Sequence, residues 1–232
     1  MSNRDIVVLS AVRSPIGAFG GSLADFESTE LAGIVMKEAI ARSGVDPLAI
    51  NYVTVGTTMP TDSRYAYVSR VASIQAGLSM DSVAMQVSRL CASGLQGIVT
   101  TAQNLMLGDA DYGIGGGVEV MSKATYLMPA LRSGARMGDT KAIDSMVAVL
   151  TDPFGVGHMG ITAENLATKH GFSREDQDAL RLNPSVALRL PSPKVVSSRR
   201  SSRSSNRPAR AKWCSTPTST SSPTRRWNHW PR

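Results

Sequence analysis

The feature that most constrains the fold of this chain is a strand-to-helix junction predicted within residues 83–108. Residues 83–87 are mostly apolar and predict a strand, and apolar residues then recur at helical spacing until Gly108. The apolar stripe of the predicted helix consists of Leu95, Ile98, Val99, Ala102, Leu105 and Met106. Cys91 lies between the two segments, so we expect it at a sharp turn, at the N-terminus of a buried helix.

This position favours a reactive thiol at Cys91. The free N–H groups and the dipole at the start of a helix stabilise a thiolate. The next three residues, Ala92, Ser93 and Gly94, are small and leave room for a substrate carbonyl. Such a turn is typical of a nucleophile in acyl transfer. The alternative is an inert core cysteine, because free cysteine is among the most buried residue types.

The rest of the body alternates between strands and helices. A helix is expected between Ser28, as its N-cap, and Gly44, which ends it. Its apolar face is predicted to be Leu31, Ile34, Val35 and Ala39. The other expected elements are strands at residues 6–12, 52–57 and 112–118 and a helix at 66–76. This alternation predicts an α/β fold with βαβ units and a parallel sheet.

Four segments in this order resemble those of thiolases, the acetyl-CoA acetyltransferases and β-ketothiolases. They are residues 11–21, the Cys91 turn at 87–95, the glycine-rich segment 115–122, and residues 158–165. The resemblance covers about residues 5–180 and is strongest to bacterial β-ketothiolases. It implies a layered α/β fold. Residues 1–121 would form the first half of that fold, and residues 122–180 would form part of a loop domain that binds coenzyme A.

The resemblance also implies a chemistry and a set of site residues. Cys91 would accept an acyl group from a coenzyme A thioester, in the synthesis of acetoacetyl-CoA or the thiolysis of a 3-ketoacyl-CoA. His158 would lie beside the pantetheine arm, and Met159 would shape the acyl pocket. Residues expected to support the nucleophile turn are Ser88, Arg89 and Gly94, and Glu119 and Ser122 are expected to support loops. Thiolases usually carry Asn where this chain has Ser88.

No cofactor beyond the coenzyme A thioesters is expected. The run Gly115–Gly117 lacks the Gly-Lys-Ser/Thr ending of a phosphate loop and the spacing of a dinucleotide site. His170 and His229, taken with the two cysteines Cys91 and Cys214, show no metal-ligand spacing. Intact thiolases imply a homo-oligomer, a dimer or a tetramer, with acyl-CoA and coenzyme A as partners.

Charge divides the chain into two chemically different pieces. The net charge of +7 arises in residues 181–232, which hold 12 Lys and Arg and no Asp or Glu, whereas residues 1–180 hold 13 basic and 18 acidic residues. Two cysteines do not make a disulfide framework. We find no signal peptide and no apolar run of the ~18 residues that a membrane span needs. A cytoplasmic protein without membrane attachment is therefore expected.

Residues 181–232 are rich in Ser, Arg and Pro and lose all periodicity. One interpretation is a disordered basic arm that binds nucleic acid. We favour a shift of the reading frame at or just before residues 180–181, so nucleic acid is not expected as a partner. Back-translation of residues 180–194, and of the stretches beginning at Lys212 and Arg225, permits thiolase-like segments in a single alternative frame.

Three parts of thiolase chemistry lie in the second half of the family's fold. They are a histidine loop that activates the nucleophile, a second cysteine that acts as base, and a further oxyanion donor. The 232 residues contain no such half, so we expect this chain to be inactive as written. The alternatives are a ketoacyl-synthase-like condensing enzyme, which shares the fold, and a non-catalytic polypeptide whose basic tail binds nucleic acid.

Overall fold

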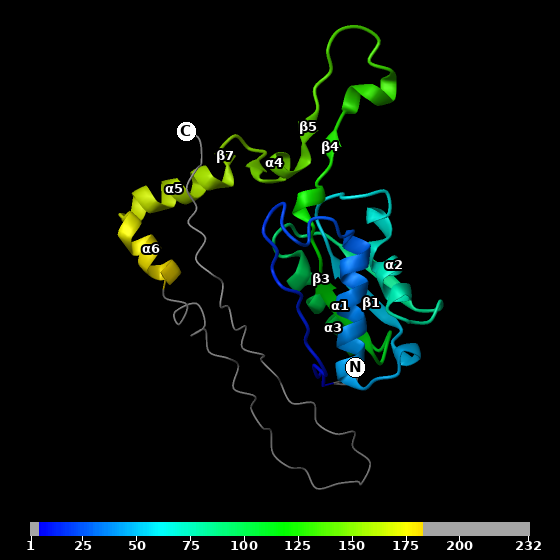
Figure 1. Cartoon of the computed structure of the whole chain (residues 1–232). Helices are drawn as coiled ribbons and strands as arrows, with labels where there is room; N and C mark the ends of the chain where they lie inside the picture. Colours follow the sequence, from blue (N-terminus) through cyan, green and yellow to red (C-terminus); the bar gives the residue numbers. More distant parts are fainter. Residues whose placement is uncertain (1–4, 183–232) are drawn as a thin grey trace.

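A three-stranded parallel sheet organises the chain in the computed structural model, which describes residues 5–182 (Figure 1). Its strands are β1 (Tyr52–Gly56), β2 (Val83–Val87) and β3 (Gly113–Gly117), in the order β2-β1-β3. Gly56 pairs with Val87 on one side and with Gly117 on the other. The carboxyl ends of all three strands therefore lie at one edge of the sheet, where ligand sites of open α/β sheets form. The predicted α/β fold class is confirmed.

Helices cover both faces of this sheet. Helices α1 (Ser28–Ser43) and α2 (Val68–Gln75) pack together on one face, and α3 (Ser93–Leu107) lies on the other. Val53 and Val55 of β1 are almost fully buried and form the centre of the core with α1 and α2. Because side chains alternate along a strand, the intervening residues of β1 face α3.

The second face of the sheet is built almost without side chains. A Cβ atom on Gly56 would lie 2.1 Å from the Ser93 carbonyl oxygen, and one on Gly97 would lie 2.4 Å from that of Gly116. Gly117 is similarly close to the Cα atom of Gly94. Glycine at these positions lets α3 contact the sheet backbone to backbone. We call this contact, made by Gly56, Gly94, Gly97, Gly115 and Gly117, the glycine seam; beside it, Gly113 leaves room for the Thr101 side chain.

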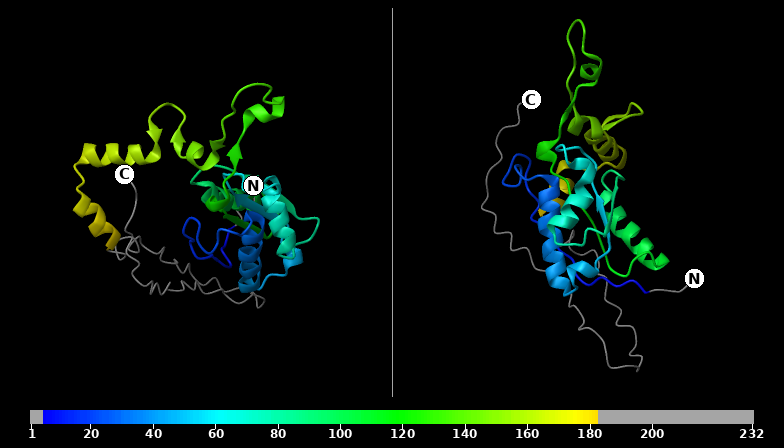
Figure 2. Two further views of the ribbon diagram at one scale, coloured as in Figure 1. Left: turned by 45° about the horizontal axis from the view of Figure 1, so that its top comes forward. Right: turned by 90° about the vertical axis from the view of Figure 1, so that its right-hand side faces the viewer.

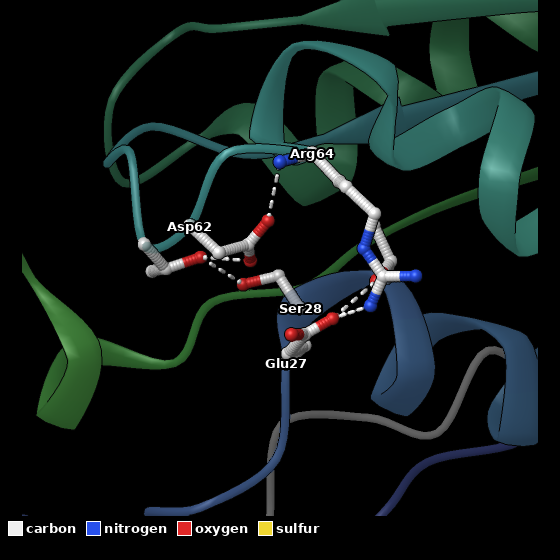
Figure 3. A network of polar contacts seen from close by, with 6 residues as sticks. Glu27, Ser28, Asp62 and Arg64 are labelled. Atoms are coloured by element: carbon white, nitrogen blue, oxygen red, sulfur yellow. Dashed lines mark hydrogen bonds and ion pairs between the residues drawn. The ribbon is translucent and has the colours of Figure 1, made fainter.

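The loop after β1 is fastened to the start of α1 (Figure 3). The Ser28 hydroxyl lies 2.9 Å from that of Thr61, and the Arg64 guanidinium forms an ion pair with Glu27. Asp62 accepts hydrogen bonds from the Thr61 hydroxyl at 3.0 Å and from the Arg64 backbone N–H at 2.7 Å. These contacts fix the far end of the loop that begins at the sheet's carboxyl edge.

The strand predicted at residues 6–12 is wrong in this structure. Residues 5–18 have no regular secondary structure, and the side chains of Val7 and Val8 are mostly exposed. A strand needs a hydrogen-bonded neighbour, and the three-strand sheet formed within residues 5–182 does not include this segment. The apolar composition of this segment indicates a strand, but it does not predict which strand, if any, would pair with it.

The helix predicted from Ser28 to Gly44 forms, but it buries another face. Its N-cap is Glu27 instead of Ser28, and Gly44 ends it with a φ of 70°. The expected Ile34 is 52% exposed, whereas Ala32, Gly33, Met36 and Ile40 are buried. Small residues let α1 approach α2 closely: a Cβ on Gly33 would lie 2.9 Å from the Gln75 side chain. The face of α1 with the smaller side chains is therefore buried against α2, instead of the more apolar face.

Beyond β3 the chain leaves the sheet as an extended arm, residues 126–182 (Figures 1 and 2). The arm contains α4 (Ser145–Val149), α5 (Met159–His170), α6 (Arg174–Leu182), the paired strands β4 (Tyr126–Leu127) with β5 (Ile143–Asp144) and β6 (Thr151–Asp152) with β7 (Gly157–His158), and the 3-10 helix η4 (Pro129–Ser133). Further 3-10 helices are η1 (Pro47–Ala49), η2 (Tyr65–Tyr67) and η3 (Met121–Lys123). The predicted division at residues 121 and 180 remains a prediction, and the tail from residue 183 lies outside the described residues.

Candidate active site around Cys91

Cys91 lies in a tight turn between β2 and α3. The chain leaves β2 at Val87, and α3 begins at Ser93. Leu90, directly before Cys91, has a φ of 49°, which is rare for a residue with a side chain. The Cys91 residue is exposed and its thiol is free. The prediction that Cys91 precedes a helix at a strand-to-helix turn is confirmed. The helix itself is only half-buried, because Leu95, Ile98 and Met106 are exposed.

The hydroxyl of Ser93 holds the turn together from inside. The Ser93 residue is 4% exposed, and its Oγ accepts a hydrogen bond from the Arg89 backbone N–H at 2.8 Å. The same hydroxyl donates to the Leu90 carbonyl oxygen at 2.6 Å. The Ser93 backbone N–H also donates to that oxygen at 2.9 Å. Left-handed backbone at a non-glycine residue persists only where its surroundings enforce it, and these contacts do so.

A second layer behind Ser93 comes from the carboxyl ends of β1 and β3. The Thr58 hydroxyl, just after β1, lies 3.2 Å from Ser93 Oγ and donates to the Leu90 carbonyl oxygen at 3.3 Å. Glu119, just after β3, accepts hydrogen bonds from the backbone N–H groups of Thr58 at 2.9 Å and Met59 at 3.1 Å. Glu119 thus supports a loop, which agrees with the role expected for it.

Tyr65 extends this polar layer. Burial raises the pKa of the Tyr65 phenol above its ordinary value of 10.0, and the negative charge of Glu119 raises it further. Hydrogen bonds with Gln86 and Thr57 partly offset these two effects. The carboxyl edge of the sheet therefore carries one carboxylate among hydroxyl groups and backbone donors.

The residues predicted to support the turn differ in what they contact. Arg89 is hydrogen-bonded through its backbone to Ser93, and its guanidinium donates to the Gln96 side chain at 2.8 Å. Gly94 belongs to the glycine seam at the start of α3. Ser88 is exposed, and within residues 5–182 its hydroxyl makes no hydrogen bond. Their supporting roles remain predictions.

His158 and Met159 lie at the start of α5, on the arm (Figure 1). His158 is the N-cap of α5, where its Nδ1 accepts a hydrogen bond from the Gly160 N–H at 3.1 Å. Met159 opens α5 and is 51% exposed. The structure therefore does not bring these two predicted substrate-binding residues together with Cys91.

Sequence reasoning does not identify Ser93 and Thr58 as residues of the candidate site. It points to Ser93 only as a small residue after Cys91, and it does not point to Thr58. Both signals were present in the sequence, because Thr58 follows a buried strand and Ser93 follows the nucleophile turn. Since the ends of parallel strands meet at one edge, polar residues directly after each strand could have been grouped.

Most of the apolar stripe of α3 faces outward instead of toward the sheet, although Ala102 and Leu105 are half-buried. Leu95, Ile98 and Met106 are 66%, 49% and 53% exposed, whereas Ser93, Gly97 and Thr101 face the sheet. Within residues 5–182, the predicted burial is therefore wrong for Leu95, Ile98, Val99 and Met106. The glycine seam explains the reversal, since backbone contact leaves no room for leucine or isoleucine between α3 and the sheet.

Metal and membrane features are absent from the part of the chain that the structure describes. Among residues 5–182, no three or more His, Cys, Asp and Glu side chains group in a way that could hold a metal ion. None of the helices in this range is long and apolar enough to span a membrane.

Comparison with known proteins identifies the family of this α/β fold and cysteine turn. The family described as "Thiolase, N-terminal domain" matches residues 6–185. The chain belongs to the thiolase family, and the match ends close to where the composition changes. The predicted resemblance is confirmed.

Individual relatives agree with this assignment. "Beta-ketothiolase BktB" of Cupriavidus necator is 48% identical over 179 residues, covering 77% of this chain and 45% of that protein. The mitochondrial 3-ketoacyl-CoA thiolase of Mus musculus is 38% identical over 180 residues. The chain thus spans about 45% of the length of these relatives.

Solved structures give the same fold. The acetyl-CoA acetyltransferase of Syntrophomonas wolfei superposes with a TM-score of 0.71 at 41% identity, covering 76% of this chain and 44% of that one. Human mitochondrial 3-ketoacyl-CoA thiolase in complex with CoA gives 0.73 at 37% identity, covering 76% and 45%.

Proposed function

We propose that this chain carries the nucleophilic half of an acyltransferase that acts on coenzyme A thioesters. The observation that supports the proposal most directly is the Cys91 turn: an exposed free thiol two residues before a helix, held by the buried hydroxyl of Ser93. Acetyl-CoA acetyltransferases and 3-ketoacyl-CoA thiolases are the enzymes to which the chain is similar.

The proposed first step is attack of the Cys91 thiolate on the thioester carbonyl. The sulfur–carbon bond to Cys91 forms, the bond to coenzyme A breaks, and coenzyme A leaves as a thiol after taking up a proton. The backbone N–H of Cys91 would help to hold the oxyanion of this step. In the second step, the deprotonated α-carbon of another acetyl-CoA would displace Cys91 and give acetoacetyl-CoA.

The remaining expectations belong to the same proposal. His158 would contact the pantetheine of coenzyme A, and Met159 would contact the acyl group, once residues 126–182 lie over the site. Acyl-CoA and coenzyme A are the proposed partners, in a cytoplasmic enzyme that forms a homo-oligomer when intact. No resident cofactor is proposed.

Acetylation of Cys91 tests the proposal. The 232-residue chain is incubated with acetyl-CoA, and acetyl groups on its cysteine peptides are quantified by mass spectrometry. Cys91→Ser should abolish acetylation, because an alkoxide forms far less readily than a thiolate at neutral pH. Cys214→Ser is the matched control and should leave acetylation unchanged. Acetylation that persists in Cys91→Ser, or that never occurs in the parent chain, would contradict the proposal.

A further inference from the structure

We infer that Glu119 is a positioning residue for the Cys91 turn: it fixes Thr58 against the backbone of Leu90, the residue before the nucleophile. The inference deepens the proposed function and rests on it for the role of Cys91. Glu119 acts through Thr58 and makes no hydrogen bond to Cys91 within residues 5–182.

Both oxygens of the Glu119 carboxylate are used by donors of one short loop. Oε2 accepts from the Thr58 N–H at 2.9 Å. Oε1 accepts from the Met59 N–H at 3.1 Å and from the Thr57 hydroxyl at 3.3 Å. Two backbone donors facing two different oxygens require a carboxylate, since an amide would present an NH₂ group to one of them. The loop is thereby locked at its first three residues.

The other end of the loop is already fixed by the contacts of Ser28 and Glu27 with Thr61 and Arg64 (Figure 3). At the near end, the Thr57 N–H donates to the Val87 carbonyl oxygen at 3.1 Å, and Glu119 is the acceptor that holds the Thr58 N–H. Thr125 adds a hydrogen bond from its hydroxyl to the Pro60 carbonyl at 3.3 Å, between the two fixed ends.

Thr58 transfers this constraint to the turn. Its hydroxyl reaches both the Leu90 carbonyl oxygen and the Ser93 hydroxyl. Leu90 is held at a φ of 49°, although its side chain is 59% exposed and contributes little to the core. The preference of such a residue for ordinary backbone angles corresponds to a factor of about five to thirty in population. Loss of the constraint should let Leu90 relax and displace the adjacent thiol.

Glu119→Gln is the sharpest variant, because it keeps the shape and removes only one acceptor oxygen and the charge. Glu30→Gln is the matched control, since Glu30 is exposed on α1. Leu90→Gly should rescue Glu119→Gln, because glycine adopts positive φ without strain. Thr58→Val interrupts the same chain of contacts at the hydroxyl while leaving the backbone bonds to Glu119 in place.

The measurement is the rate at which iodoacetamide alkylates Cys91 in the full chain carrying Cys214→Ser, with thermal melting followed in parallel. Alkylation should fall about five- to thirtyfold in Glu119→Gln and in Thr58→Val. It should stay unchanged in Glu30→Gln and return most of the way in Glu119→Gln combined with Leu90→Gly. A merely structural role would lower the melting temperature without this rescue.

Three outcomes overturn the inference: parent-like alkylation of Glu119→Gln, parent-like alkylation of Thr58→Val, or a loss that Leu90→Gly does not restore. If Glu119→Gln does not fold, Thr58→Val with and without Leu90→Gly decides the question. Acetylation by acetyl-CoA is recorded separately. A parent chain that is alkylated but not acetylated refutes the proposed function, while the alkylation rates still decide the role of Glu119.

Discussion

At the scale of single residues, the pKa of Tyr65 depends on the charge behind the Cys91 turn. Its pKa is raised by burial and by the nearby Glu119 carboxylate. A proton is then held more tightly in the folded chain than in the unfolded one. The stabilisation is complete below the unfolded pKa, close to pH 10, and is lost as the pH rises through the higher folded pKa.

We predict that Tyr65→Phe unfolds with a shallower loss of stability above pH 10 than the parent chain, because no phenolate has to form in a partly buried place. Urea unfolding across this range measures the slope, and the difference in absorbance at 295 nm between the two proteins follows the Tyr65 titration. Glu119→Gln should shift that titration toward lower pH, since one of its causes is removed. A Tyr65 titration at or below pH 10 would refute the account.

The position of Cys91 could be predicted from sequence because it depends on local order: an apolar strand, a few small residues, and helical spacing afterwards. The partners of the turn could not. Along the chain, Thr58 lies 35 residues before Ser93 and Glu119 lies 26 residues after it. Only the alignment of the strand ends brings the three residues together. The family resemblance groups His158 with Cys91, whereas in the structure His158 is the N-cap of α5 on the arm.

At the scale of elements, the glycine seam between α3 and the sheet makes a sharp prediction. Gly97→Ala should destabilise the chain by about 1–3 kcal/mol although alanine favours helix, because the new methyl group would press on the Gly116 and Thr54 carbonyl oxygens. Gly116→Ala is the matched control, since a Cβ there meets nothing within 4 Å. Urea denaturation compares the two, and equal stability would show that the seam tolerates separation.

Elements were predictable where backbone and side-chain signals agreed. Strand 83–87 and the helix ends at Gly44 and Gly108 follow from apolar runs and from glycines that adopt left-handed angles. Burial was not predictable where small residues make the contacts. In both α1 and α3 the more apolar stripe lies away from the tightest packing, because alanine, glycine, serine and threonine allow closer approach.

At the scale of the whole molecule, the family match ends at residue 185, and the amino-acid composition changes at residue 181. The two boundaries nearly coincide. We predict that the coding DNA across codons 175–185 contains a shift, and that the alternative frame continues a thiolase sequence. Sequencing of this DNA beyond the stop codon tests the first point directly. An uninterrupted frame with no thiolase-like continuation would exclude a shift.

The same prediction can be tested by activity, with a frame-restored protein expressed beside the 232-residue chain. Thiolysis of acetoacetyl-CoA should be confined to the restored protein, because the general acid–base groups that it regains are each worth about 10²–10⁴-fold in rate. Comparable thiolysis by the two proteins would show that the parts expected in a second half are not needed.

Backbone-to-backbone contact along the glycine seam makes α3 and the sheet one mechanical unit. Along the seam the start of α3 contacts the backbone of β1 and β3, and the Thr101 hydroxyl adds a hydrogen bond to the Ile114 carbonyl oxygen at 3.2 Å, so α3 cannot shift without disturbing these two strands. The arm has no such anchor: α5 contains no buried residue. We therefore expect any rearrangement on ligand binding to fall on the arm, because the cysteine end of α3 is held against the sheet.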